Sequence, residues 1–237
     1  MVLNILHLYP KEMNLYGDHG NVLALRRRCE WRGIGANIIP CEPGNAFPED
    51  VDLIFGGGGQ DSGQSKIEQD LLSHGERLRA LIEGGTPALV ICGLYQLFGK
   101  GFRTSEGQFI KGIGIFPAET TAGSKRLVGN ITLSTDAFGE IVGFENHSGL
   151  TFLNGCQPFG TVVRGAGNNG KDHTEGAVYK NCIGTYLHGP ILPKNPALTD
   201  HLIRTALKNK YPDAPSLLPL DDAVEEAAHK NAAGRPR

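Results

Sequence analysis

A short apolar run that stops at a cysteine is the strongest constraint on how this chain folds. Residues 88–92 read Ala-Leu-Val-Ile-Cys, and Gly93 follows. A strand that is buried on both faces of a parallel sheet has this continuous apolar character. Reactive groups in such sheets lie just beyond the carboxyl ends of the strands. The thiol of Cys92 is therefore predicted at a strand-to-helix turn, near helix N–H groups that favour the thiolate.

Strand-like and helix-like segments alternate along most of the chain, which predicts an α/β fold with a mostly parallel sheet flanked by helices. The predicted strands are residues 2–8, 36–40, 51–55 and 88–91, and the predicted helices are 21–31, 67–81 and 197–209. From residue 112 to 186, short glycine-punctuated strands predict a mixed or antiparallel extension of the sheet. We expect one domain over residues 1–211 and a C-terminal extension over 212–237. The composition of residues 227–237 predicts fraying or disorder.

Composition and charge exclude several classes of function. The net charge of -2 gives no electrostatic reason to expect nucleic acid or an anionic membrane as partner. Apolar runs are short, and the amino terminus has the pattern of a first strand and not of a signal peptide, so we expect a cytoplasmic protein without membrane insertion. The five cysteines form no Cys-x-x-Cys pair, which argues against a disulfide framework or a zinc ribbon. We expect no cofactor and no metal.

A glycine-rich loop follows the third predicted strand. It reads Phe55-Gly-Gly-Gly-Gly-Gln60-Asp61. Successive glycines let backbone N–H groups approach a ligand closely, and such groups suit a developing negative oxygen. The loop lacks the Gly-Lys-Ser or Gly-Lys-Thr ending of a phosphate-binding loop. A plain tight turn is the alternative interpretation.

A histidine ends another strand-like segment, Cys182-Ile-Gly-Thr-Tyr-Leu-His188. An imidazole that reaches a thiol can hold it as thiolate and then protonate a leaving amine. A histidine at a strand end is also common as a hydrogen-bonded surface residue. Contact between His188 and Cys92 does not follow from the order of residues alone.

Four motifs together carry a family resemblance: Gly-Gly-Gly-Gln-Asp, Ile-Cys-Gly-x-Tyr-Gln, Gly-Phe-Glu-Asn-His-x-Gly and Tyr-Leu-His-Gly-Pro. In this order they resemble the class I glutamine amidotransferases of the cobyric acid synthase type. Residues 1–211, including Asn14-Leu-Tyr-Gly-Asp-His-Gly-Asn21, are more closely similar to the glutaminase subunits of lipid II isoglutaminyl synthase. The resemblance implies a flavodoxin-like fold that hydrolyses L-glutamine to glutamate and ammonia. It also implies a heterodimer with a MurT-like, ATP-dependent ligase, which amidates D-glutamate of the peptidoglycan stem to D-isoglutamine.

The resemblance assigns roles to residues of this chain. Cys92 matches the family's nucleophile, His188 its general base and Arg126 its substrate-binding arginine. The assignment of Arg126 is chemically sensible because a guanidinium grips a carboxylate through two parallel hydrogen bonds; a solvated loop charge is the alternative. The expected oxyanion hole consists of the backbone amides of Gly57, Gly58 and Gly93.

Two positions depart from the family pattern. Class I enzymes usually carry a glutamate two residues after the histidine, but this chain has Pro190, which indicates a Cys-His dyad. If another carboxylate orients the imidazole, Glu145 is our candidate. The nucleophile turn usually reads Cys-Gly-Gly, and Leu94 replaces the second glycine. Its side chain either shifts the following helix or sits on backbone that is already helical.

Three functions stay open at this stage. The first is a glutaminase subunit that supplies a peptidoglycan-amidating ligase. The second is an amidotransferase subunit for another carboxylate acceptor, such as a corrin. The third is a non-catalytic binding subunit, which the absent glutamate and Leu94 favour and the presence of both Cys92 and His188 opposes.

A basic cluster lies on the first predicted helix, at Arg26, Arg27, Arg28 and Arg32. Such clusters are commonly solvated faces. The alternative is a docking surface for an acidic patch on the synthetase.

Overall fold

A mainly parallel sheet forms the centre of the molecule. The computed structural model describes residues 1–236, and within them the chain forms two β-sheets. The first has the strand order β11-β12-β4-β3-β1-β2, and all its neighbours are parallel except β11 and β12. Its strands are β1 (Val2–Leu8), β2 (Gly35–Cys41), β3 (Leu53–Gly56), β4 (Ala88–Ile91), β11 (Ala177–Tyr179) and β12 (Cys182–Thr185). The predicted parallel sheet is confirmed.

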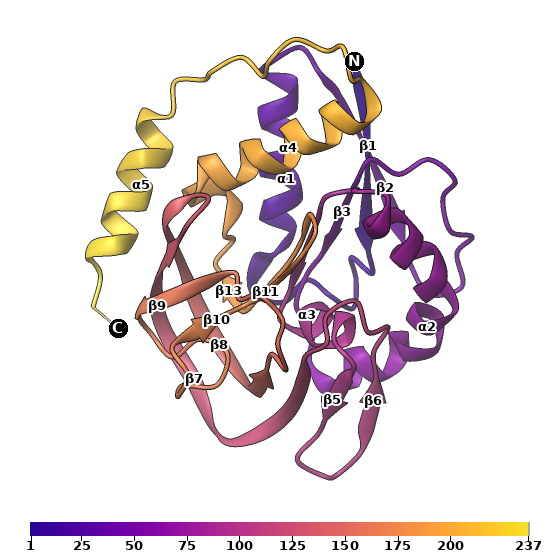
Figure 1. Cartoon of the computed structure of the whole chain (residues 1–237), viewed down its shortest axis with the longest axis vertical. Helices are drawn as coiled ribbons and strands as arrows, with labels where there is room; N and C mark the ends of the chain where they lie inside the picture. Colours follow the sequence, from indigo (N-terminus) through magenta and orange to yellow (C-terminus); the bar gives the residue numbers. More distant parts are fainter. Residues whose placement is uncertain (237) are drawn as a thin grey trace.

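Helices cover both faces of this sheet, with α1 and α4 together on one face and α2 and α3 on the other (Figure 1). Their bounds are α1 (His19–Glu30), α2 (Asp61–Glu83), α3 (Gly93–Phe98), α4 (Pro196–Lys210) and α5 (Ala223–Gly234), with short 3-10 helices η1 (Leu15–Gly17) and η2 (Leu192–Lys194). Within residues 1–236, no helix is both long and apolar enough to span a bilayer.

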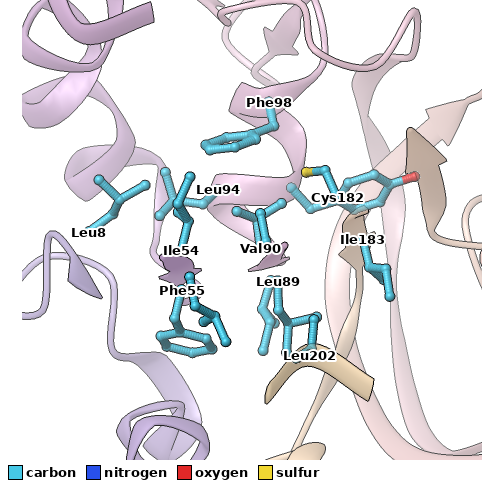
Figure 2. Packing of buried hydrophobic residues seen from close by; sticks show 14 of the residues in the cluster. Leu8, Ile54, Phe55, Leu89, Val90, Leu94, Phe98, Cys182, Ile183 and Leu202 are labelled. Carbon is cyan, nitrogen blue, oxygen red and sulfur yellow. The ribbon is translucent and has the colours of Figure 1, made fainter. Parts of the chain in front are cut away.

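The core lies between the central strands and these helices. Figure 2 shows Leu94 and Phe98 of α3 on one side of β4 and Leu202 of α4 on the other, next to Leu89. All four side chains are fully buried, as is Val90 between them. Burying such a side chain contributes roughly 1.5–3 kcal/mol. This packing holds α3, and with it the turn that precedes α3, against the carboxyl end of β4.

The second sheet is mostly antiparallel and is built on two long strands. Its strands are β5 (Gly101–Arg103), β6 (Phe109–Lys111), β7 (Glu119–Thr135), β8 (Gly139–Phe152), β9 (Gly160–Arg164), β10 (Thr174–Glu175) and β13 (Leu187–His188). β7 and β8 pair as a hairpin whose register shifts between Ala122 and Leu127.

The expectation of only short strands after residue 112 was wrong. Glycines there do not all end strands: a side chain on Gly143 would meet Leu187 at 2.7 Å, and one on Gly149 would meet Gln96 at 2.3 Å. Within a strand, glycine often marks the close approach of another chain segment. These glycines allow β8 to pack tightly against its neighbours without interruption.

The C-terminal extension differs from our prediction. We expected disorder over residues 227–237, whereas the structure forms α5 over Ala223–Gly234; residue 237 lies outside the described residues. None of the residues of α5 is buried. Polar contacts with the rest of the chain accompany the helix, such as the one between His229 Nδ1 and the carbonyl oxygen of Lys194, 2.8 Å apart. Composition did not reveal them because the partners are distant in sequence.

The basic cluster of α1 is paired within the chain. The ion pairs are Arg26–Glu30, Arg27–Glu30, Arg28–Asp200, Arg28–Asp222 and Arg32–Asp200. The side chains of Arg28 and Arg32 are only 4% and 2% exposed, so these residues are not a solvated face. Arg32 also donates to the carbonyl oxygen of Leu218 at 2.6 Å. This half of the cluster anchors the C-terminal extension on α1 and α4.

Candidate active site

Cys92 lies in the turn between β4 and α3, as predicted. Its backbone has φ 49° and ψ −103°, a conformation that is strained for any residue other than glycine. The Cys92 amide donates to the carbonyl oxygen of Thr185 at 2.8 Å, which ties the turn to β12. The residue is 7% exposed. A strained turn between a strand and a helix presents the nucleophile in several hydrolase folds.

The residues that depart from the family pattern each pack against a glycine. Leu94 is helical, and a side chain on Gly56 would lie 2.3 Å from its Cδ1 atom. Likewise, a side chain on Gly20 would lie 2.6 Å from Cγ of Pro190. The backbone at Leu94 is therefore already helical, and Gly56 provides the space for its side chain. Leu94 therefore does not need to shift the helix that follows it, which was the other possibility considered.

His188 is fully buried on β13, which pairs with β8. Its Nδ1 atom lies 3.1 Å from Oδ1 of Asp18, which is also fully buried. The other ring nitrogen, Nε2, makes no hydrogen bond within residues 1–236. Burial by itself disfavours the imidazolium, but the hydrogen bond and charge of Asp18, together with the neighbouring Cys92, outweigh it and raise the pKa of His188 to about 10. This raised pKa favours the imidazolium form of His188 at neutral pH, and the ring lies beside Cys92.

The carboxylate on His188 is Asp18 and not Glu145. The two carboxylate oxygens of Glu145 accept hydrogen bonds from the amides of Ala166 and Gly167 at 2.8 and 2.9 Å. Asp18 precedes His188 by 170 residues, so no local pattern links them. The only signal was the stretch from Asn14 to Asn21, which entered the resemblance without a role for its aspartate.

The glycine loop passes directly over Cys92 and His188. A side chain on Gly58 would lie 2.7 Å from the His188 ring and 3.0 Å from Cβ of Cys92. The Gly58 amide donates to Oδ2 of Asp18 at 2.7 Å, so it is not available to an oxyanion, contrary to our expectation. Gly59 lines the adjacent cavity and packs against Gly93, and within residues 1–236 the amides of these two glycines donate no hydrogen bond.

Arg126 lies in the irregular segment of β7 and lines the same cavity. Its Nε atom donates to Oδ1 of Asn146 at 2.5 Å, and one terminal nitrogen donates to the hydroxyl of Tyr16 at 3.0 Å. The Tyr16 ring in turn stands edge-on to the ring of His188, with centroids 4.9 Å apart. Arg126 is therefore held beside the site and is not a free loop charge.

This cavity has a volume of about 340 Å³. Cys92, Gly59 and Arg126 line it, together with residues to which sequence reasoning assigned no role, among them Gln64, Gln96 and His147. The volume suits a small molecule such as an amino acid. Within residues 1–236, no cluster of three or more His, Cys, Asp or Glu side chains has the geometry of a metal site.

Comparison with solved structures shows the fold. A structure of PurLQS from Thermotoga maritima superposes with a TM-score of 0.60 at 15% sequence identity, covering 86% of this chain and 98% of that chain. At this identity the likeness concerns the fold alone.

Sequence comparison shows the family. Residues 4–196 match the model of the CobB/CobQ-like glutamine amidotransferase domain. The subunit GatD of the glutamine-hydrolyzing lipid II isoglutaminyl synthase of Staphylococcus aureus is 44% identical over 213 residues, which are 88% of this chain and 86% of that protein. The GatD subunit of Streptococcus pneumoniae is 40% identical, over 94% of this chain and 88% of its own length. With this match and the arrangement of cysteine, histidine and cavity, the chain belongs to the CobB/CobQ-like glutamine amidotransferases.

Proposed function

We propose that this chain is the cytoplasmic glutaminase subunit of a lipid II isoglutaminyl synthase. It hydrolyses L-glutamine and delivers the ammonia to a MurT-like, ATP-dependent ligase, which amidates D-glutamate of lipid II to D-isoglutamine. The observation that carries the proposal is the buried Asp18–His188 pair beside Cys92, at a cavity that Arg126 borders. The GatD relatives, aligned over most of both chains, support the choice of acceptor.

In the proposed reaction, the Cys92 thiolate attacks the carboxamide carbon of glutamine, and a carbon–sulfur bond forms as the carbonyl electron pair moves to oxygen. The amides of Gly59 and Gly93 stabilise this oxyanion. The imidazolium of His188 then gives its Nε2 proton to the nitrogen, the carbon–nitrogen bond breaks, and ammonia leaves a thioester behind. Neutral His188 takes a proton from water, which attacks the thioester and releases glutamate and the thiolate.

Asp18 has a positioning role in this scheme. Its Oδ1 atom accepts from Nδ1 of His188, which leaves Nε2 facing the reaction, and its Oδ2 atom accepts from the amide of Gly58. One carboxylate therefore fixes both the imidazole and the loop that leads to Gly59. The negative charge also stabilises the imidazolium that the thiolate requires.

The test is covalent trapping with the diazoketone analogue of L-glutamine, followed by intact-mass analysis and peptide mapping. We expect one adduct, on Cys92, that excess L-glutamine suppresses and that the Cys92→Ser variant lacks. Trapping needs a single attack and no sustained turnover. A folded chain that gives no adduct, alone or with its synthetase, would refute the catalytic function.

The acceptor requires a separate experiment. The chain is purified from its host, and the copurifying ligase is assayed for glutamine-dependent amidation of lipid II. We expect the Cys92→Ser complex to amidate lipid II with added ammonia but not with glutamine. Ammonia transfer to a corrin carboxylate in place of lipid II would overturn the proposed acceptor while keeping the glutaminase.

A further inference from the structure

Gln64 lines the cavity and has a buried side-chain oxygen. The residue lies on α2 and is 1% exposed. Its Nε2 atom donates to Oε1 of Gln96 at 2.6 Å, and Nε2 of Gln96 donates to the hydroxyl of Tyr186 at 3.0 Å. These bonds orient the Gln64 amide, and its Oε1 atom accepts no hydrogen bond within residues 1–236. A buried acceptor without a hydrogen bond raises the free energy of the protein, so such acceptors usually have a partner in the functional state.

His147 provides a second acceptor in the same cavity. It is 3% exposed, and its Nδ1 atom lies 2.8 Å from the carbonyl oxygen of Gly149. A carbonyl oxygen only accepts, so Nδ1 carries the proton. Burial above all lowers the pKa of His147 to about 4, and the neutral ring therefore keeps an acceptor lone pair at Nε2. That atom also has no partner within the described part of the chain.

The ring of His147 is held in place. It stacks on the ring of Tyr186 with centroids 3.6 Å apart and an angle of 4° between the planes. Its neighbour Asn146 holds Arg126, so the acceptor at Nε2 belongs to the segment that positions the guanidinium. Within residues 1–236, the cavity lining therefore combines a cation, Arg126, with acceptors on Gln64 and His147 that have no hydrogen-bond partner. This set complements an α-amino acid, whose carboxylate accepts and whose ammonium donates.

We propose that Oε1 of Gln64 and Nε2 of His147 bind the α-ammonium group of the substrate and so make the site selective for an α-amino acid. This inference rests on the proposed glutaminase function and extends it. The carboxylate lies on Arg126, the ammonium satisfies both buried acceptors, and the side-chain amide extends to Cys92. A glutamine analogue without the amino group leaves both acceptors unpaired, and a site built around a polar group rejects a ligand that lacks it.

The experiment compares labelling of Cys92 in the full-length chain by two diazoketones, the analogue of L-glutamine and its counterpart without the α-amino group. In the Gln64→Met and His147→Phe variants, we expect labelling by the amino-bearing probe to slow about tenfold. Labelling by the other probe should change less than about twofold, because it never used these acceptors. The ratio of the labelling rates of the two probes distinguishes the roles, because a purely structural role would change both rates alike and leave this ratio unchanged.

The matched control is Gln69→Met, the same substitution on the exposed face of α2, which should leave the preference between the probes unchanged. Thermal melting checks that Gln64→Met and His147→Phe are folded. If one of them does not fold, the labelling of the other tests the inference. Equal slowing with both probes would overturn the inference while wild-type labelling, suppressed by glutamine, upholds the proposed function. Absence of wild-type labelling would instead refute the proposed function itself.

Discussion

The two sheets contribute different parts of the site. Around the parallel sheet, the loops and turns that follow β1, β3 and β4 contribute Asp18, the glycine loop and Cys92. The long hairpin of β7 and β8 in the antiparallel sheet (Figure 1) contributes two further residues, which are Arg126 on β7 and His147 on β8. His188 joins them, since β13 pairs with β8 although it follows β12 of the parallel sheet.

The difference between the sheets is one of chemistry and of local structure. The parallel strands β3 and β4 are buried along their whole length and end in turns that hold reactive groups in strained or crowded positions. The strand β8 alternates buried and partly exposed residues, and its residues 146–149 line the cavity. We therefore expect changes in the loops and turns after the parallel strands to act on the chemical step, and a change at Arg126 on the hairpin to act on substrate binding.

The largest effect is expected on the parallel side, from Asp18→Asn. The amide can still accept from the Gly58 N–H, but its NH₂ group then faces His188 and favours the wrong tautomer. The rate of ammonia release should fall between about 10²- and 10⁴-fold with little change in KM. Steady-state glutaminase kinetics measure this. Asp213→Asn, at an exposed aspartate, is the control. If Asp18→Asn lowers the rate of ammonia release by less than about threefold, the positioning role is refuted.

The same variant tests the ionic state of His188. The pKa of His188 in the folded state, about 10, exceeds its ordinary value of 6.5. Protonation of His188 therefore stabilises the folded state fully below pH 6.5, and this stabilisation is lost as the pH rises through 10. Asp18→Asn should therefore lose less stability than the wild type between those limits. Urea unfolding midpoints across this range measure the difference. Parallel curves for the two proteins would show that Asp18 does not raise the pKa.

A smaller effect is expected from Arg126→Gln on the hairpin, and it should concern KM where Asp18→Asn concerns the rate. Losing the charge-assisted hydrogen bonds to the α-carboxylate should raise KM for glutamine about 10- to 100-fold while kcat changes little. Lys125→Gln removes a neighbouring exposed charge from the same strand and is the matched control. If kcat falls and KM does not change, the division of roles between the sheets is incorrect.

The smallest effect concerns Glu175, at the junction of the sheets. Its carboxylate accepts from Thr185 and from the amide of Tyr186, just beyond the carbonyl that holds Cys92. Burial raises the pKa of Glu175 from 4.5 to about 8, so the folded state keeps a proton that the unfolded state loses, and stability declines as the pH rises from 4.5 to 8.

Glu175→Gln mimics the protonated carboxyl, so its stability should depend less on pH over this interval. Urea midpoints at the two ends of the interval measure this, and Glu106→Gln, at an exposed glutamate, should keep the wild-type slope. An unchanged slope in Glu175→Gln would mean that the side chain is ionised throughout.

Sequence predicted local features of the fold well and long-range pairings poorly. The apolar run before Cys92 and the glycines after β3 led to the correct strand-to-helix turns, because strand, turn and helix are encoded by neighbouring residues. The hairpin was described as short strands because its glycines mark close contacts with other segments and not strand ends. The disorder expected near the C-terminus was wrong because the contacts of α5 come from residues such as Lys194.

Residue order and local pattern by themselves predicted the parallel sheet and the strand-to-helix turn at Cys92, and the motifs indicated the family, whose resemblance suggested roles for Cys92, His188 and Arg126. Only the tertiary structure decided which carboxylate contacts His188 and, within residues 1–236, which glycine amides and buried acceptors have no hydrogen-bond partner. Asp18, Gly58 and Gln64 show the physical reason. A hydrogen bond depends on distance and direction between groups, and these are established when segments far apart in the chain pack together.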